Sequence, residues 1–447
     1  MAFARSTTNR KSRGSNSVVG FNNKDGDYTQ AMAVVNGNNE FVDMTSDSFG
    51  RLRTSHLYPM FETNTRYDID PTLWTTIGTV GAATTIVDKA AAAIVLNSGN
   101  IENDQAGLRS LKNFRYQAGK SQLIMQTVSI IDPDAVSCRR EWGYYDEDDG
   151  LFWTIDDNGV FGVSLRDRGV TTFVAQTDFN RDKLDGTGSS GFSIDLTKAN
   201  IYGISFQYLG VGVAKLFVYD EKGSIITAHV FENANKNVYS YMSTAVLPLS
   251  YLCRVVGPNG TNGGMNVLCA TVNSEAGADP VYSIVKSADT GAFISEAGGT
   301  EKSILTIQAK DNIENPAASG PVKNKVEVVP KSLSVAVEGQ AAIVRVRKNS
   351  TLASAVFVSA GDESSVNIDK TDVAATDGEL LATYVINKDT SKTIDIYPTI
   401  FATNRNSITK NNAGDKESIT ITIAKATGGS AGANTDVLAS LTWAEIR

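Results

Sequence analysis

The stretch "LFWTIDDNGVFGVSL", Leu151–Leu165, decides the fold class of this chain. Two runs rich in aromatic and aliphatic residues flank the tripeptide Asp157–Gly159. Asn and Gly tolerate the positive backbone φ that a tight turn needs, so the stretch predicts a β-hairpin. The segment "KLFVYDEKGSIITAHVF", Lys215–Phe231, repeats this design around Asp-Glu-Lys-Gly. We therefore expect consecutive antiparallel strands in this part of the chain.

The same pattern extends over most of the 447 residues. The chain has 38 glycines, and stretches with the 3.6-residue period of an amphipathic helix are nearly absent. We predict an all-β protein, with an antiparallel β-sandwich or jelly roll over residues 41–290 and a connection over 291–322. A second, smaller β-sandwich over 323–447 follows, because "KVEVVPKSLSVAV" and "ESITITIAK" alternate with period two.

Residues 1–40 have a different composition from the rest of the chain. They are rich in Ser, Asn and Gly, and their basic residues precede the first acidic one, Asp25. We predict an extended basic arm that is disordered without a partner, or that orders on a neighbouring subunit or an acidic surface. The candidate attachment residues are Arg5, Arg10, Lys11 and Arg13. No apolar stretch follows them, so we do not expect a secretory signal.

Charge and cysteine content exclude several classes of function. The net charge of −8 argues for solubility and against nucleic-acid binding, and no apolar run is long enough for a membrane helix. Cys138, Cys253 and Cys269 form no CxxC pair. We therefore predict neither a zinc site nor a disulfide framework, and we expect synthesis in a reducing cytoplasm. No metal, cofactor or membrane partner is expected.

The segment "FRYQAGKS", Phe114–Ser121, ends like a nucleotide-binding P-loop. A P-loop needs a glycine five residues before its Gly-Lys pair, but Phe114 occupies that position. The residues after Ser121 also read as a strand rather than a phosphate-binding helix. We predict instead a bend at Gly119, with Tyr116 packed into the sandwich and Lys120 in solvent or at a subunit interface.

Other motifs have ordinary structural interpretations. Gly186, Gly188 and Gly191 match a GxGxxG pattern, but their flanks predict a loop between strands. The acidic run Asp146–Asp149 lacks EF-hand spacing, which leaves a solvated turn or a calcium site of another kind. His56 and His229 have no nucleophile context and are predicted to be structural or solvent-facing. We predict no catalytic residue.

The aromatic side chains of "EWGYYDEDDGLFW" are candidates for contact with another molecule. Trp142, Tyr144 and Tyr145 could stack on sugar rings or meet another subunit. Their spacing along a strand is equally typical of a core, and the sequence leaves these alternatives open.

Eight short segments follow one another in a specific order along the chain. They are "FGRLRTS" (49–55), "FRYQAGKSQLI" (114–124), "DKLDGTGSSG" (182–191), "YLGVGVAKLFV" (208–218), "LPLSY" (247–251), "VNSEAG" (272–277), "VKNKVEVVPKSLSV" (322–335) and "SAVFVSAGDESSVNID" (354–369). This succession resembles a family of virion structural proteins of tailed bacteriophages, frequent in phages of marine bacteria and cyanobacteria. The likeness covers roughly residues 45–447, and Ala118 stands where that family usually has proline.

The resemblance implies a non-enzymatic component of the virion, made in the host bacterial cytoplasm. We expect it in the tail, baseplate or fibre-attachment apparatus, as a homo-oligomer in contact with other virion proteins. The alternatives are a capsid-surface decoration or head-fibre protein, and a protein that binds a host surface glycan. The resemblance supplies no catalytic residues.

Overall fold

The computed structural model describes residues 57–65, 67–257, 261–275, 283–297, 301–313, 322–361, 363–371, 373–401, 406–426 and 434–446, and the backbone of the short strands β1 (Val19–Asn22) and β2 (Tyr28–Ala31). Its regular structure is almost entirely antiparallel β-strand, which confirms the predicted fold class. The helices in the described part are the short η1 (Gln176–Asp178) and the π-helical turn η2 (Tyr397–Phe401). Neither is long enough to cross a membrane.

The first sandwich consists of two antiparallel sheets. One has the order β12-β11-β10-β9-β16-β7-β4, and the other has the order β15-β14-β13-β8-β17-β6-β5, with β3 also paired to β17. The strands are β3 (Leu57–Asn64), β4 (Trp74–Val80), β5 (Thr84–Asp88), β6 (Ala93–Asn97), β7 (Gln105–Ser110), β8 (Ser121–Ile131), β9 (Cys138–Tyr145), β10 (Gly150–Ile155), β11 (Phe161–Asp167), β12 (Val170–Ala175), β13 (Asn200–Phe206), β14 (Ala214–Tyr219), β15 (Ile225–Phe231), β16 (Leu249–Val255) and β17 (Gly264–Glu275).

Both predicted hairpins are present. β10 and β11 pair with Ile155 opposite Phe161, and Gly159 has a φ of 79° in the turn between them. β14 and β15 are joined by the second predicted turn, where the Asp220 carboxylate accepts the backbone N–H groups of Lys222 and Ser224. The positive φ and the aspartate bonds are the features that the two sequence motifs predict.

The core of the first sandwich is built from aromatic residues on facing strands. Trp142, Trp153 and Tyr251 lie opposite one another on adjacent strands, and all three are fully buried. The Trp153 ring stacks on Phe161 at a centroid separation of 5.6 Å, and the Trp142 ring meets Tyr202 of the facing sheet at 5.0 Å. Removing such a side chain costs about 3–5 kcal/mol, so these contacts contribute strongly to the stability of the first sandwich.

The second sandwich pairs a sheet of order β18-β32-β23-β30, with β19 on β32, against a sheet of order β25-β28-β20-β31-β24-β29, in which β27 pairs with β20 and β26. A two-stranded ribbon, β21 with β22, accompanies them. The strands are β18 (Ile284–Asp289), β19 (Ile294–Glu296), β20 (Lys302–Ala309), β21 (Asn312–Ile313), β22 (Val322–Lys323), β23 (Glu327–Gly339), β24 (Ala342–Lys348), β25 (Thr351–Leu352), β26 (Val358–Ser359), β27 (Val366–Asp369), β28 (Val373–Thr376), β29 (Glu379–Ile386), β30 (Thr390–Asp395), β31 (Ser418–Lys425) and β32 (Thr435–Ile446).

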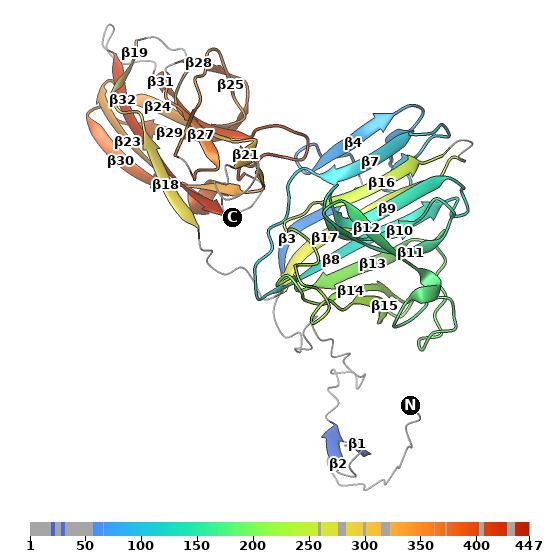
Figure 1. Cartoon of the computed structure of the whole chain (residues 1–447). Coiled ribbons are helices and arrows are strands. Elements are labelled where there is room, and N and C mark those ends of the chain that lie inside the picture. The colour runs from blue at the N-terminus through green and yellow to red at the C-terminus, as the bar shows by residue number, and fades with distance from the viewer. Residues whose placement is uncertain are drawn as a thin grey trace, which may run out of the picture.

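The boundary between the sandwiches differs from the predicted one. β18 and β20 pair with β32 and β31, so the second sandwich starts near residue 284 and the predicted connection over 291–322 contains three of its strands. The segments around β20 are rich in glycine and alanine, which favours a connection. The strand that pairs with β20, β31, lies more than a hundred residues further along the chain. Figure 1 shows the two sandwiches, the first coloured blue to yellow and the second yellow, at β18, to red.

Candidate functional site at the domain junction

Polar side chains gather where the two sandwiches meet. On the first sandwich, the chain after β7 and the turn between β9 and β10 lie at one end of the same sheet. On the second, the segment before β23 and the segment before β31 reach the same place, and the backbone N–H of Asn412 donates to the Leu111 carbonyl at 2.9 Å. We call this region the domain junction, defined by Lys112, Asp146, Lys325, Asn412 and Glu417.

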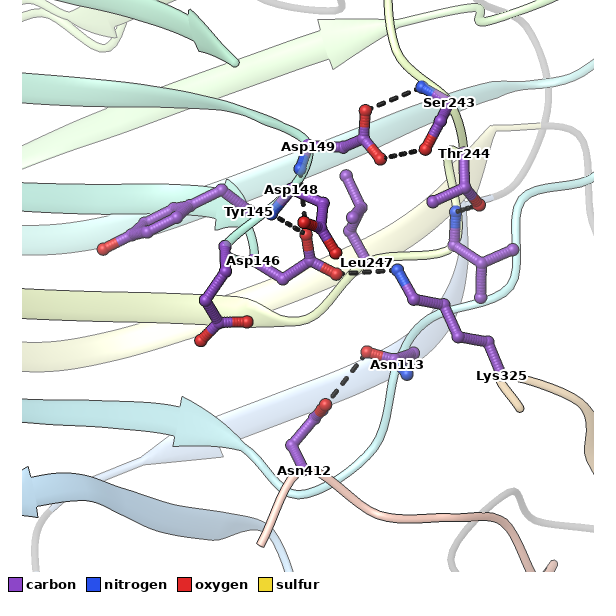
Figure 2. A network of polar contacts seen from close by, with 12 residues as sticks. Asn113, Tyr145, Asp146, Asp148, Asp149, Ser243, Thr244, Leu247, Lys325 and Asn412 are labelled. Atoms are coloured by element: carbon purple, nitrogen blue, oxygen red, sulfur yellow. Dashed lines mark hydrogen bonds and ion pairs between the residues drawn. The ribbon is translucent and has the colours of Figure 1, made fainter. Parts of the chain in front are cut away.

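Asp146 and Lys325 form an ion pair between the sandwiches. The Lys325 Nζ lies 2.6 Å from Asp146 Oδ2, and the carboxylate is buried (Figure 2). Asp146 Oδ1 also accepts the backbone N–H groups of Asp148 and Asp149, each at 2.9 Å. Burial raises the pKa of Asp146, but the Lys325 ammonium and the backbone bonds outweigh it and hold the pKa below its usual range.

The acidic turn has a structural role that the sequence did not reveal. The Asp149 carboxylate accepts both the backbone N–H and the hydroxyl of Ser243, and Arg109 lies 2.5 Å from Glu147 (Figure 2 shows the Asp149 contacts). Asp146 and Asp149 are buried, so a solvated turn describes only part of the run. Within the described ranges, no group of three or more His, Cys, Asp or Glu side chains is placed to hold a metal ion.

A second charged cluster joins the sandwiches through Lys112. Its Nζ donates to the Ser407 carbonyl at 2.5 Å and lies 3.9 Å from Glu417 Oε2. Glu417 is buried, accepts the Thr409 N–H at 3.1 Å and pairs with Lys348 at 3.0 Å. Burial lowers the pKa of Lys112 to about 8; Glu417 opposes this shift, and the neighbouring Lys348 charge adds to it.

Neutral contacts complete the junction, and two hollows flank it. The Asn412 side-chain amide donates to the Ser110 carbonyl at 3.0 Å and to Asn113 Oδ1 at 3.2 Å (the second bond is drawn in Figure 2).

One hollow, of about 380 Å³, has an apolar wall that includes Met60, Phe61, Leu73 and Phe114. The other, of about 570 Å³, is polar and includes Arg109, Glu147, Lys323 and Lys410. Both are within the size range of small-ligand sites.

The predicted contact aromatics lie elsewhere. Trp142 and Tyr144 are fully buried between the sheets, so the core alternative describes both, and neither side chain reaches a glycan or another subunit. Tyr145 points to the opposite face of its sheet, where Phe152 and the guanidinium of Arg166 cover its ring. Burial raises the pKa of Tyr145. The predicted attachment residues Arg5, Arg10, Lys11 and Arg13 lie outside the described residues.

The GKS motif is a turn, as predicted. Gly119 has a φ of 87°, Tyr116 stacks on Phe206 at 6.0 Å, and Ser121 begins β8. Of the two predicted positions of Lys120, the one in solvent is wrong, because this residue is only 7% exposed; the one at a subunit interface stays a prediction. The Phe114 N–H donates to the carbonyl of the distant Leu247, and this closure of the segment has no signature in the local sequence.

The two remaining motifs are also structural. In the glycine-rich loop, the Asp182 carboxylate accepts the N–H groups of Leu184 and Ser190, which holds the loop in place. His229 is buried on β15 beside Phe179 and Phe231, and burial lowers its pKa. His56 lies outside the described residues.

Comparisons with known proteins give matches among solved structures alone. No protein-family model matches the sequence, and no curated protein matches it either. Among solved structures, the carbohydrate recognition domain of Emp47p is 13% identical, with a TM-score of 0.31 over 50% of this chain and 97% of that chain. A putative beta-glucanase from Mycobacterium abscessus is 11% identical, with a TM-score of 0.33 over 48% of this chain and 100% of that chain. Arcelin-5, a lectin-like defence protein from Phaseolus vulgaris, is 7% identical, with a TM-score of 0.31 over 48% of this chain and 98% of that chain.

Proposed function

We propose that this chain is a non-enzymatic structural component of a tailed-bacteriophage virion. It would occupy the tail, baseplate or fibre-attachment apparatus as a homo-oligomer, in contact with other virion proteins. The order of the eight sequence segments supports this assignment. The observation that carries the structural role is the domain junction, where buried charges of one sandwich pair with charges of the other.

The buried ion pairs of the domain junction suit a structural protein that carries load. Breaking a buried ion pair by removing one partner costs about 3–5 kcal/mol, because the other charge is left without compensation. Asp146 and Glu417 are both buried and both contact lysines across or beside the junction. Buried ion pairs between the sandwiches support a structural component.

The charged groups of the junction are also engaged within the fold. Asp146 accepts two backbone N–H groups as well as Lys325, and Asp149 accepts two groups of Ser243. Carboxylates held in this way contribute to the architecture, which supports a structural role over acid–base chemistry.

The test is the location of the chain in purified particles of the phage that encodes it. Mass spectrometry of the particles should detect the chain, and cryo-electron microscopy should place both sandwiches at the tail, neck or baseplate. A variant lacking residues 1–40 should fail to enter particles if the arm is the attachment element. Absence of the full-length chain from particles overturns the proposal, and density on the capsid lattice supports the decoration alternative instead.

A further inference from the structure

The polar hollow beside the domain junction has more cationic than anionic side chains in its wall. Residues of both sandwiches line this hollow of about 570 Å³, among them Lys325 and Asn412, which Figure 2 shows facing the first sandwich. Four cations and two anions line it: Arg109, Lys323, Lys325 and Lys410, with Glu147 and Asp311. This local excess of positive charge contrasts with the net charge of −8 of the whole chain. The wall is therefore suited to an anion.

Glu147 does not neutralise its side of the hollow. Its carboxylate lies 2.5 Å from Arg109. Burial raises the pKa of Glu147, but Arg109 and, more weakly, Lys323 lower it below the usual value, so both cations act on this one carboxylate. Lys323 is exposed and makes no ion pair within the described residues. Asp148 and Asp415, in the neighbouring turns, do not line the hollow.

Asp311 is likewise shared by two lysines. Its Oδ1 lies 2.7 Å from Lys410 Nζ, and its Oδ2 lies 2.6 Å from Lys416 Nζ. Lys325 has a counter-ion of its own, Asp146, at 2.6 Å. The hollow therefore has one cation in excess at each of its two carboxylates. A phosphate monoester carries about 1.5 to 2 negative charges at pH 7, which matches an excess of this size.

The uncharged part of the wall suits hydroxyl groups rather than an apolar ligand. It has no aromatic side chain and no aliphatic one larger than Ala413, so a nucleobase or an acyl chain finds no apolar surface here. Asn412 Oδ1, Asn113 Nδ2 and the Asn312 amide make no hydrogen bond within the part of the chain that the structure describes. Such amide groups donate to and accept from hydroxyl groups. The asparagines of the wall are Asn113, Asn312, Asn324, Asn411 and Asn412.

We propose that the polar hollow binds a saccharide that carries a phosphate group. Lys323 and Lys410 contact the phosphate, whose oxygens accept charge-assisted hydrogen bonds from several lysines at once. The amides of Asn113, Asn312 and Asn412 contact the sugar hydroxyls. The volume of about 570 Å³ leaves room for a sugar ring beside the phosphate. This inference goes beyond the structural role proposed above and does not depend on it.

Isothermal titration calorimetry of the full chain tests the proposal, with glucose 6-phosphate as the ligand and with glucose and inorganic phosphate as partial ligands. Glucose 6-phosphate should bind with a Kd below about 1 mM at low ionic strength, and added salt should weaken the binding, because exposed charges are screened. Glucose should show no binding, and inorganic phosphate should bind at least about tenfold more weakly. Equal affinity for inorganic phosphate indicates an adventitious ion only and overturns the proposal, as does an absence of binding by glucose 6-phosphate.

Three variants locate the ligand. Lys323→Gln should weaken the binding of glucose 6-phosphate about tenfold, because a hydrogen bond from a charged donor is lost. Asn312→Ala should weaken the binding of glucose 6-phosphate and leave that of inorganic phosphate unchanged. Lys222→Gln, in the exposed turn between β14 and β15, is the matched control and should bind like the wild type. Equal melting temperatures confirm the fold of all three. Wild-type affinity in Lys323→Gln overturns the assignment of this hollow.

Discussion

Replacing Glu417 with glutamine tests the charge cluster at the domain junction. The substitution keeps the side-chain shape and an oxygen that can accept the Thr409 N–H, but it removes the negative charge between Lys112 and Lys348. Two buried ammonium groups would then face each other without the carboxylate between them, and Glu327 would remain as the weaker anionic influence on Lys112. Loss of the charge should lower the free energy of unfolding by about 3–5 kcal/mol at pH 7.

The pH dependence separates this mechanism from a simple packing defect. The pKa of Lys112 falls from 10.5 to about 8 on folding, which corresponds to a cost of about 3 kcal/mol at neutral pH. The unfolded chain binds more protons between these two values, so the contribution of Lys112 to stability increases as pH rises from about 8 to about 10.5. In Glu417→Gln the pKa of Lys112 should fall further. The rise of the free energy of unfolding with pH should therefore begin at a lower pH than in the wild type.

Urea unfolding at a series of pH values between 7 and 10 measures both effects, with the wild type and Lys112→Met as references. Lys112→Met should cost less than Glu417→Gln at pH 7, because Glu417 keeps Lys348 as an ion-pair partner and the desolvation cost of the Lys112 ammonium is removed. It should also flatten the pH dependence above pH 8. A loss below about 1 kcal/mol in Glu417→Gln, or an unchanged pH profile in Lys112→Met, refutes the reasoning.

Three further predictions concern the junction, the GKS turn and the core. Lys325→Met should lower the free energy of unfolding by about 3–5 kcal/mol in urea at pH 7, because it leaves the buried Asp146 carboxylate without its lysine partner. In the wild type, the stability from this ion pair should be lost as pH falls through the lowered pKa of Asp146. An equal loss in Lys323→Met, a neighbouring lysine, would contradict this. Gly119→Val should cost about 1–3 kcal/mol in thermal unfolding, because Gly119 has a φ of 87°, although a Cβ there meets no neighbour; an unchanged melting temperature argues against strain. Trp153→Ala should lower the free energy of unfolding by about 3–5 kcal/mol and broaden the near-ultraviolet circular dichroism bands. Trp153→Phe should lower the free energy of unfolding by less.

The sequence was informative where the physical cause is local. Alternation with period two, and turns such as Asp157–Gly159, predict strands and hairpins because side-chain direction and allowed φ values depend on neighbouring residues. The failed glycine spacing before Gly119 excludes a P-loop for the same reason. The start of the second sandwich was placed too late, because the role of Lys302–Ala309 depends on pairing with a strand that ends at Lys425.

By itself, the sequence determined that this protein is all-β, has two sandwiches and turns at its Asn-Gly and Lys-Gly sites. The tertiary structure alone decided which face of each strand is buried, so that Trp142 lies in the core and Tyr145 on the outer face. It also decided that Asp146 meets Lys325, 179 residues away, and that Lys112 meets Glu417. The physical reason is range: strand and turn preferences act over a few residues, whereas burial and ion pairing depend on sheet register and domain contact.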